Sequence, residues 1–318
     1  MAIAILVGRN EVEQQTYNWF TQGWKRALLS FNPDLDVRTW PNLGNYADID
    51  YVLVWNHPLG ILKKFTQAKA IASLAAGVDH LLVDPDIDHH VPIVRIMDPF
   101  MATDIVQYVT AYVLQYVKLV SHWALKQQQK MWFKQPPFTL SNKIIGIMGL
   151  GHLGGKAAHV LHQLGLKLVG WSHSPKTITG MTHYAGKAQL HEFLAQANVL
   201  ICMLPLTKET KNILNRQTFA QLPKASYLIN VGRGEHLVED DLLDALASGQ
   251  LSGACLDVFR HEPLPFDHPF WSHPHIIVTP HIASVTNPET AAPQVMENYR
   301  RLLAGEELLH RVNLRKGY

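Results

Sequence analysis

The sequence predicts an α/β fold of two lobes, each a doubly wound parallel sheet covered by helices, with a cleft between the lobes. Short apolar runs alternate with amphipathic stretches along the chain, which is typical of parallel strands joined by helical crossovers. A second series of the same kind begins at Lys143, after a long helical pattern. The chain of 318 residues suits two domains of roughly 150 residues each.

The first hundred residues supply the strands of one lobe. Apolar runs at 2–8, 36–40, 51–55 and 92–96 contain many β-branched and aromatic side chains and are predicted strands. Residues 11–29 place apolar side chains at intervals of three and four and are predicted to form one helix.

A long helix is predicted next, because apolar side chains from Ile105 to Val120 recur at helical spacing. Pro136 and Pro137 are expected to end this region. We expect the helix to act mechanically, as the connection between the lobes.

Six apolar runs after Lys143 are the predicted strands of the second lobe, a number that suits a dinucleotide-binding domain. Their sequences are KIIGIMG, LKLVGWS, NVLICML, SYLINV, GACLDVF and HIIVTP. From about Asn287 the pattern is helical again, so we expect the chain to return to the first lobe. The predicted domains are 1–100 with 286–318, which binds substrate, and 101–285, which binds the dinucleotide.

Composition and charge exclude several functional classes. Hydrophobic residues make up 47% of the chain and charged residues 17%, which excludes a disordered protein. The formal net charge is +2 without a dense basic run, so no nucleic-acid or membrane partner is expected. The first residues lack the pattern of a signal peptide, and no run approaches the ~18 apolar residues of a membrane span. Cys202 and Cys255 lie in apolar runs and are expected to be core thiols, which suits the cytoplasm.

A glycine-rich turn predicts a dinucleotide site. It contains Gly149, Gly151 and Gly154, with His152 and Leu153 before the last glycine. The first glycine allows a sharp turn, the second lets a pyrophosphate approach the backbone, and the third lets the helix pack on the sheet. A bland glycine turn has the same pattern, but here an apolar strand precedes the motif and an amphipathic helix follows it.

The loop after the next strand favours NADPH over NADH. That strand ends in Ser172, His173, Ser174 and Lys176, with no acidic residue near it in the sequence. An acid at this position would bind the ribose 2′-hydroxyl of NAD, whereas hydroxyls, an imidazole and an ammonium suit a 2′-phosphate. A polar loop without discrimination is the alternative, so NAD stays open as a second cofactor.

Three side chains after the last three predicted strands carry complementary chemistry. Arg233, Glu262 and His281 each follow a strand, and the carboxyl ends of parallel strands line one crevice. A guanidinium grips a carboxylate and polarises the adjacent carbonyl, and an imidazole exchanges a proton near neutral pH. A carboxylate beside that imidazole favours its protonated form. The set predicts reduction of a 2-oxo acid.

Several motifs together resemble the D-2-hydroxyacid dehydrogenase family over nearly the whole chain. They are GLGHLG (149–154), LPLTKET (204–210), NVGRGE (230–235), LDVFRHEPLP (256–265) and TPHIAS (279–284). Four other segments are most similar to the family's members that reduce glyoxylate and hydroxypyruvate: AAGVDH (75–80), WSHS (171–174), VEDDLL (238–243) and NLRKGY (313–318).

The resemblance implies a flavodoxin-like substrate domain, a Rossmann-like dinucleotide domain and a homodimer. It implies that His281 is the acid/base, Glu262 its partner and Arg233 the substrate anchor. It further implies that backbone N–H groups of Gly77 and Val78, with Ala76, hold the substrate carboxylate. A glycine where a strand passes into a helix exposes such groups, although a plain helix start has the same pattern.

Four more residues receive roles from the resemblance. Asp257 is expected at the nicotinamide carboxamide, Pro205 beside the adenosine, and Val231 in the cofactor site. Trp55 is expected either at the substrate pocket or in the core.

Two residues depart from the family pattern. His173 stands where the glyoxylate-reducing members often carry arginine, and Gln107 stands where many members carry glutamate. A run of histidines, His268, His273, His275 and His281, is interrupted by prolines and lacks the spacing of a zinc site, so no metal is expected.

Two alternative functions remain. A dinucleotide-sensing binding protein could keep this fold and act through protein partners, although the intact Arg233, Glu262 and His281 favour an enzyme. A different oxidoreductase on the same scaffold, acting on formate or phosphite, is disfavoured by the segments similar to glyoxylate-reducing members.

Overall fold

The computed structural model describes residues 2–132 and 143–313. The predicted helix end at Pro136 and Pro137 and the tail after Asn313 lie outside these residues. The chain divides into two compact units, one reaching Met101 and resuming at Thr286, the other running from Ala102 to Val285. We describe each unit by itself.

The first unit is a five-stranded parallel sheet in the order β2-β1-β3-β4-β5, which is the flavodoxin-like order. The strands are β1 (Ala2–Val7), β2 (Asp36–Thr39), β3 (Ile49–Trp55), β4 (Ala70–Ser73) and β5 (Ile93–Arg95). The helices are α1 (Glu11–Thr16), α2 (Asn18–Leu29), α3 (Asp79–Leu82) and α10 (Pro288–Ala304), with 3₁₀ turns at Tyr46–Asp48 and Leu62–Lys64.

Successive side chains along a strand of the first sheet point to opposite faces and therefore pack into two separate cores. Ile3, Ile5 and Val7 pack with α2 and α10 on one face. Ala4 and Leu6 pack on the opposite face, in a core that also contains residues of α3. Both faces are therefore covered, which is why strand β1 is buried along its whole length.

Two sequence predictions for the first unit are wrong. The predicted helix over 11–29 is two helices, because Tyr17 leaves the helical conformation (φ −100°, ψ 16°). Its ring packs edge-on against Trp55, with ring centroids 4.7 Å apart. Strand β4 was not predicted, because it is only four residues long and two of them are alanine.

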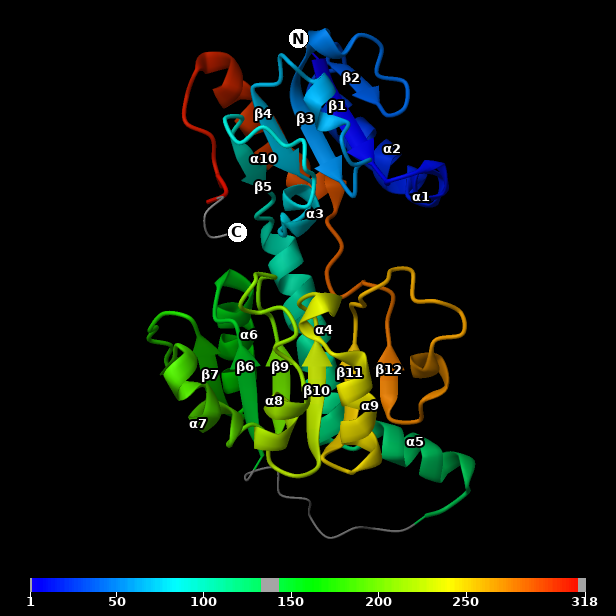
Figure 1. Ribbon diagram of the computed structural model, residues 1–318, viewed down its shortest axis with the longest axis vertical. Coiled ribbons are helices and arrows are strands. Elements are labelled where there is room, and N and C mark those ends of the chain that lie inside the picture. The colour runs from blue at the N-terminus through cyan, green and yellow to red at the C-terminus, as the bar shows by residue number, and fades with distance from the viewer. Residues whose placement is uncertain (1, 133–142, 314–318) are drawn as a thin grey trace. The chain divides into compact units, whose positions relative to one another are not determined.

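The second unit is a seven-stranded parallel sheet in the order β12-β11-β10-β9-β6-β7-β8 (Figure 1). The strands are β6 (Ile144–Met148), β7 (Lys167–Ser172), β8 (Met181–Ala185), β9 (Val199–Cys202), β10 (Ser226–Asn230), β11 (Leu251–Leu256) and β12 (Ile276–Val278). The chain order reverses between β6 and β9, which is the switch point where Rossmann folds bind dinucleotides.

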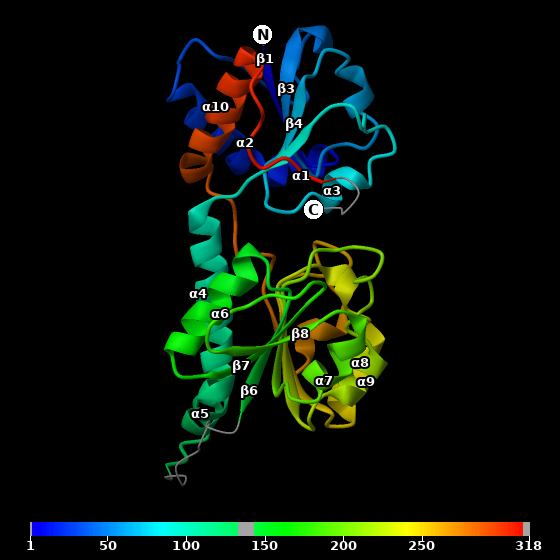
Figure 2. The same cartoon turned by 90° about the vertical axis from the view of Figure 1, so that its left-hand side faces the viewer.

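Helices cover both faces of the second sheet, as Figure 2 shows. The helices are α4 (Pro99–Val117), α5 (Val120–Gln128), α6 (His152–Gln163), α7 (Leu190–Leu194), α8 (Arg216–Gln221) and α9 (Glu239–Ala247), with 3₁₀ turns at Lys187–Gln189, Gly234–His236 and Pro269–Ser272. Residues of α4 and α6 pack with the strands in one core, and residues of α7, α8 and α9 pack in the other.

Two predictions for the second unit also need correction. The sheet has a seventh strand, β8, at its edge, where most side chains are only partly buried and the apolar signal is weak. The long helix ends at Val117, because Leu119 adopts a left-handed conformation (φ 56°). Val120 therefore opens a separate helix and is 53% exposed rather than buried.

Both cysteines are buried free thiols, which confirms that they are core residues. Burial raises the pKa of Cys202 and of Cys255 to about 12, so each remains a protonated thiol near neutral pH. Within residues 2–132 and 143–313, no helix combines the length and the apolar character that a membrane crossing requires.

Candidate active site

The three predicted catalytic residues lie on loops that follow three neighbouring strands. Arg233 follows β10, Glu262 follows β11 and His281 follows β12, and these strands pair side by side in parallel (Figure 1). Because the strands are parallel, their carboxyl ends meet at one edge of the sheet.

His281 and Glu262 form a direct contact. The Nδ1 atom of His281 lies 2.8 Å from Oε2 of Glu262, and the Phe259 N–H donates to Oε1 of the same carboxylate (2.9 Å). A carboxylate accepts hydrogen bonds, so the Nδ1–H donates, and Nε2 is the ring nitrogen that remains for chemistry. Both side chains are partly open, with 40% of His281 and 37% of Glu262 exposed.

The surroundings of Glu262 keep it ionised. Partial burial raises the pKa of this carboxyl. The hydrogen bond and charge of His281, the Phe259 N–H and the charge of Arg233 lower that pKa by more than burial raises it. The net result is a pKa below the ordinary value for glutamate. The site therefore holds a carboxylate that is paired with an imidazole and lies within electrostatic reach of the Arg233 guanidinium.

The backbone of His281 adopts an unfavourable conformation that Asp257 holds in place. Its φ of 54° costs a residue with a side chain about 1–2 kcal/mol. The His281 N–H donates to the Asp257 carbonyl (2.9 Å). The Asp257 carboxylate accepts from Thr279 Oγ1 (2.6 Å), Ile282 N–H (2.9 Å) and Ala283 N–H (2.8 Å).

Asp257 is thus an organiser of the loop that carries His281. Burial raises the pKa of its carboxyl, and the donors from Thr279, Ala283 and Ile282 offset only part of that rise. Its expected contact with the nicotinamide carboxamide stays a prediction, because its carboxylate oxygens already accept hydrogen bonds from this loop.

A buried histidine that the sequence analysis missed supports the Arg233 loop. The Arg233 N–H donates to Nδ1 of His236 (3.0 Å), so the proton of this imidazole sits on Nε2, which donates to the Pro205 carbonyl (3.3 Å). His236 therefore joins the loops after β9 and β10. The buried Val231 adds a backbone hydrogen bond to Cys202 (3.2 Å). In a chain with 18 histidines, no sequence signal singles out His236.

The glycine-rich turn has the shape that a dinucleotide needs. Gly149 has a φ of +97°, and a Cβ there would lie 2.6 Å from the Met203 carbonyl oxygen. A Cβ on Gly154 would lie 1.9 Å from the Gly149 carbonyl oxygen, so only glycine lets the helix approach. A Cβ on Gly151 would meet nothing within 4 Å. The middle glycine thus faces open space, as the approach of a pyrophosphate requires.

Helix α6 presents its N-terminus at this turn. Gly151 is its N-cap and, having no side chain, offers no acceptor to the N–H groups of the first helical turn. His152 is exposed at the first helical position, and Leu153 packs at the edge of the core. The helix dipole and first amides therefore suit an anion, and the cradle fits a bound NAD(P).

The loop predicted to select the cofactor is held by another missed histidine, His183 on β8. The Lys176 N–H donates to Nδ1 of His183 (3.4 Å), so Nε2–H donates to Ser172 Oγ (2.8 Å). Burial, with the charge of Lys176, lowers the pKa of His183 and favours this neutral form. Ser172 in turn donates to the Ser174 carbonyl (2.8 Å).

Ser172 is therefore a buried support of this loop, and its hydroxyl donates its proton within the loop. His173, Ser174 and Lys176 are exposed, so these three side chains remain for a 2′-phosphate. One acidic residue, Glu209, lies near His173 in space, although no acidic residue is near it in the sequence. The pKa of Glu209 is lowered first by its hydrogen bond to Thr207, and His173 contributes electrostatically, which places the two side chains within electrostatic reach.

The predicted substrate residues of the first unit lie after β3 and β4. Trp55 ends β3 and packs against Tyr17 and Phe20 (4.7 and 5.9 Å between ring centroids), so it is part of a core edge. Ala76 and Gly77 are partly buried, and Val78 is the N-cap of α3. No described residue of this unit accepts a hydrogen bond from the N–H of Gly77 or Val78.

Within residues 2–132 and 143–313, no group of three or more His, Cys, Asp or Glu side chains is placed to hold a metal ion. In the histidine run, His268 instead approaches Glu239 (3.5 Å). A dinucleotide cradle at the switch point and a charge-paired imidazole at the same sheet edge define an NAD(P)-dependent oxidoreductase.

Comparisons with known proteins place the chain more narrowly. Residues 110–283 match the model of the D-isomer specific 2-hydroxyacid dehydrogenase, NAD binding domain. A protein of Yersinia enterocolitica named glyoxylate/hydroxypyruvate reductase A is 42% identical over 93% of this chain and 96% of its own length. The chain belongs to the D-2-hydroxyacid dehydrogenase family.

Two solved structures agree over the whole chain. A D-isomer specific 2-hydroxyacid dehydrogenase from Xanthobacter autotrophicus Py2, in complex with NADPH and MES, is 36% identical with a TM-score of 0.89, covering 100% of this chain and 99% of that one. An NADPH-dependent glyoxylate/hydroxypyruvate reductase from Sinorhizobium meliloti, in complex with NADP and sulfate, is 31% identical with a TM-score of 0.90, covering 100% of both chains.

Proposed function

We propose that this protein reduces small 2-oxo acids of the glyoxylate and hydroxypyruvate type to 2-hydroxy acids, with NADPH as the preferred hydride donor and NADH as a second one. The observation that carries the proposal is the 2.8 Å contact of His281 with Glu262, at the sheet edge that also carries Arg233. The relatives from Yersinia and Sinorhizobium, both named as reductases of these acids, support the substrate class.

Each group of the site has a task in this reaction. A bound reduced nicotinamide supplies the hydride. His281 holds a proton at Nε2 and delivers it to the carbonyl oxygen, while Glu262 stabilises the imidazolium and fixes its orientation. Arg233 binds the substrate carboxylate and polarises the carbonyl. The free amides of Gly77 and Val78 support that carboxylate.

The cofactor is assigned to the cradle and the loops around it. Helix α6 holds the pyrophosphate at Gly151, while Pro205, Val231 and Asp257 line the remainder of the cofactor site. His173 and Lys176 are proposed to select the 2′-phosphate, and the nearby Glu209 limits that selectivity because its charge opposes a phosphate. NADPH and NADP in the two solved relatives support this choice.

A panel of two donors and four acceptors tests the proposal. We expect NADPH oxidation with glyoxylate and hydroxypyruvate, slower oxidation with pyruvate or a bulky aromatic 2-oxo acid, and a lower kcat/KM with NADH. The absorbance of the reduced nicotinamide reports each rate. Binding of NADPH without turnover of any 2-oxo acid would reject the reductase and favour the dinucleotide-sensing protein.

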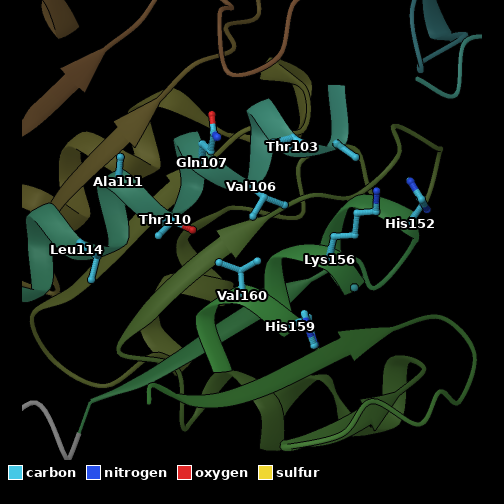
Figure 3. A pocket seen from close by; sticks show the side chains of 12 residues that line it. Thr103, Val106, Gln107, Thr110, Ala111, Leu114, His152, Lys156, His159 and Val160 are labelled. Atoms are coloured by element: carbon cyan, nitrogen blue, oxygen red, sulfur yellow. The ribbon is translucent and has the colours of Figure 1, made fainter. Parts of the chain in front are cut away.

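We propose further that two copies of this chain form a homodimer through the second unit. Helices α4 and α6 enclose an apolar groove of about 920 Å³, lined by residues such as Val106, Ala111, Leu114 and Val160 (Figure 3). Helix α5 contains no buried residue and exposes Leu125. An apolar groove and a helix with exposed apolar side chains, neither covered by another part of the described chain, suit burial against a second copy.

Light scattering after size exclusion tests the dimer. Leu114→Arg places a charge in the groove and is expected to give the mass of one chain. Leu303→Arg makes the same change on α10, where Leu303 is 47% exposed, and is expected to keep the mass of two chains. A wild-type protein with the mass of one chain at micromolar concentration would contradict the proposal.

The cytoplasm is the proposed location. Both cysteines are free thiols, as a reducing compartment maintains them, and the reaction consumes a nicotinamide donor that the cytoplasm supplies. Cell fractionation with an antibody to the protein checks this location.

A further inference from the structure

We propose that the hydroxyl of Tyr108 is a positioning group for His281 and acts through Thr279 and Asp257. The proposal rests on the role of His281 as proton donor, given above. It adds a residue of helix α4, which the motifs of the sequence do not include, to the support of the reaction.

A chain of short contacts joins α4 to the loop that carries His281. The Tyr108 hydroxyl lies 2.5 Å from Thr279 Oγ1 and 3.3 Å from Cys255 Sγ. Thr279 Oγ1 lies 2.6 Å from Oδ1 of Asp257. The side chains of Cys255 and Asp257 are buried, and those of Tyr108 and Thr279 are partly buried.

The number of available protons determines which group donates and which accepts in each of these hydrogen bonds. Thr279 has one hydroxyl proton and donates it to the Asp257 carboxylate, so Tyr108 must donate to Thr279 Oγ1. The Tyr108 oxygen then accepts from the thiol of Cys255. Burial raises the pKa of Tyr108 well above its ordinary value, so its hydroxyl keeps the proton that it donates. Each group therefore donates to the next, in the order Cys255, Tyr108 and Thr279, and the series ends at the carboxylate of Asp257.

Asp257 connects these hydrogen bonds to the backbone of the loop that carries His281. Its carbonyl accepts from the His281 N–H, and its carboxylate accepts from the next two backbone N–H groups, at Ile282 and Ala283. His281 is held at a φ of 54°, a conformation that needs such support. Without the Tyr108 hydroxyl, Thr279 Oγ1 loses a donor at a partly buried position, and the loop is expected to relax.

Tyr108→Phe isolates the hydroxyl, because the ring and its contact with Tyr112 (4.6 Å between centroids) remain. We expect kcat for 2-oxo acid reduction to fall about tenfold, with KM for the acid and Kd for NADPH unchanged. We also expect a larger solvent deuterium isotope effect on kcat, because proton transfer from a misplaced imidazole limits the rate more strongly.

Tyr116→Phe is the matched control. Tyr116 lies on the same helix, and its hydroxyl donates to the Ala225 carbonyl (3.2 Å), so the variant also loses one hydrogen bond. It has no link to the His281 loop among the contacts of the described residues, and its kcat is expected to stay within about twofold of wild type. An equal loss of kcat in both variants, or none in Tyr108→Phe, overturns the proposal.

A second pair of variants covers the case in which Tyr108→Phe does not fold. Thr279→Val removes the middle hydroxyl and is expected to lower kcat as Tyr108→Phe does, whereas Thr279→Ser keeps the hydroxyl and most of the activity. Full activity in Thr279→Val contradicts the chain. A wild-type protein that reduces no 2-oxo acid would instead reject the proposed function, so the two failures are distinguishable.

Discussion

Replacement of His281 by alanine is expected to lower kcat for 2-oxo acid reduction by about 10²–10⁴-fold, the usual contribution of a positioned acid. The imidazole is the only group assigned to deliver a proton, and water replaces it poorly. The Kd of NADPH is expected to stay within about threefold, because the glycine cradle lies after β6 and His281 after β12. Steady-state rates and fluorescence titration with NADPH measure the two quantities.

His275→Ala is the control for this experiment. His275 is an exposed imidazole that precedes β12, at the other end of the strand that His281 follows. Its removal is expected to leave kcat unchanged. Comparable activity of His281→Ala and wild type would remove His281 from the reaction, and lost NADPH binding would show a wider structural effect.

Gly151→Asp is expected to raise the Kd of NADPH at least about 100-fold. Two like charges roughly 4 Å apart repel by about 4 kcal/mol in a protein-like dielectric, and the carboxylate would stand where the pyrophosphate approaches. The fold should tolerate the change, because a Cβ at Gly151 meets nothing within 4 Å and its φ is −70°. NADPH titration and thermal unfolding measure the two effects separately.

Gly151→Asn separates charge from bulk, since its side chain has nearly the same size and no charge. A smaller loss of NADPH affinity is expected for this variant than for Gly151→Asp. Gly154→Ala provides the opposite case, because its Cβ would clash with the Gly149 carbonyl oxygen and the unfolding temperature should fall. Unchanged NADPH affinity in Gly151→Asp would place the dinucleotide elsewhere.

The sequence predicted most of the fold, because buried parallel strands appear as continuous apolar runs. The runs at β1, β6 and β10 are buried along nearly their whole length and were predicted. Strand β4 is four residues long, and β8 is an edge strand with partly exposed side chains, so neither carries that signal. Tyr17, at the break between the two helices, packs against Trp55, which lies far away in the sequence.

The candidate site was predictable to the extent that strand ends determine it. Arg233, Glu262 and His281 follow adjacent parallel strands, so topology alone brings their loops together. The residues that hold these loops were not predictable. Tyr108 and Thr279 are 171 positions apart, and their contact depends on how α4 packs on the sheet.

We propose that Glu262 maintains His281 as the proton donor, and the pH dependence of kcat in Glu262→Gln tests this role. His281 lowers the pKa of Glu262, and the resulting carboxylate lies 2.8 Å from Nδ1 of His281. The amide keeps an acceptor for Nδ1–H but removes the negative charge that stands beside the proton donor. We expect the alkaline decline of kcat for reduction to move to lower pH in Glu262→Gln than in wild type. Coincident profiles, with chemistry limiting in both proteins, would show that the carboxylate has no such role.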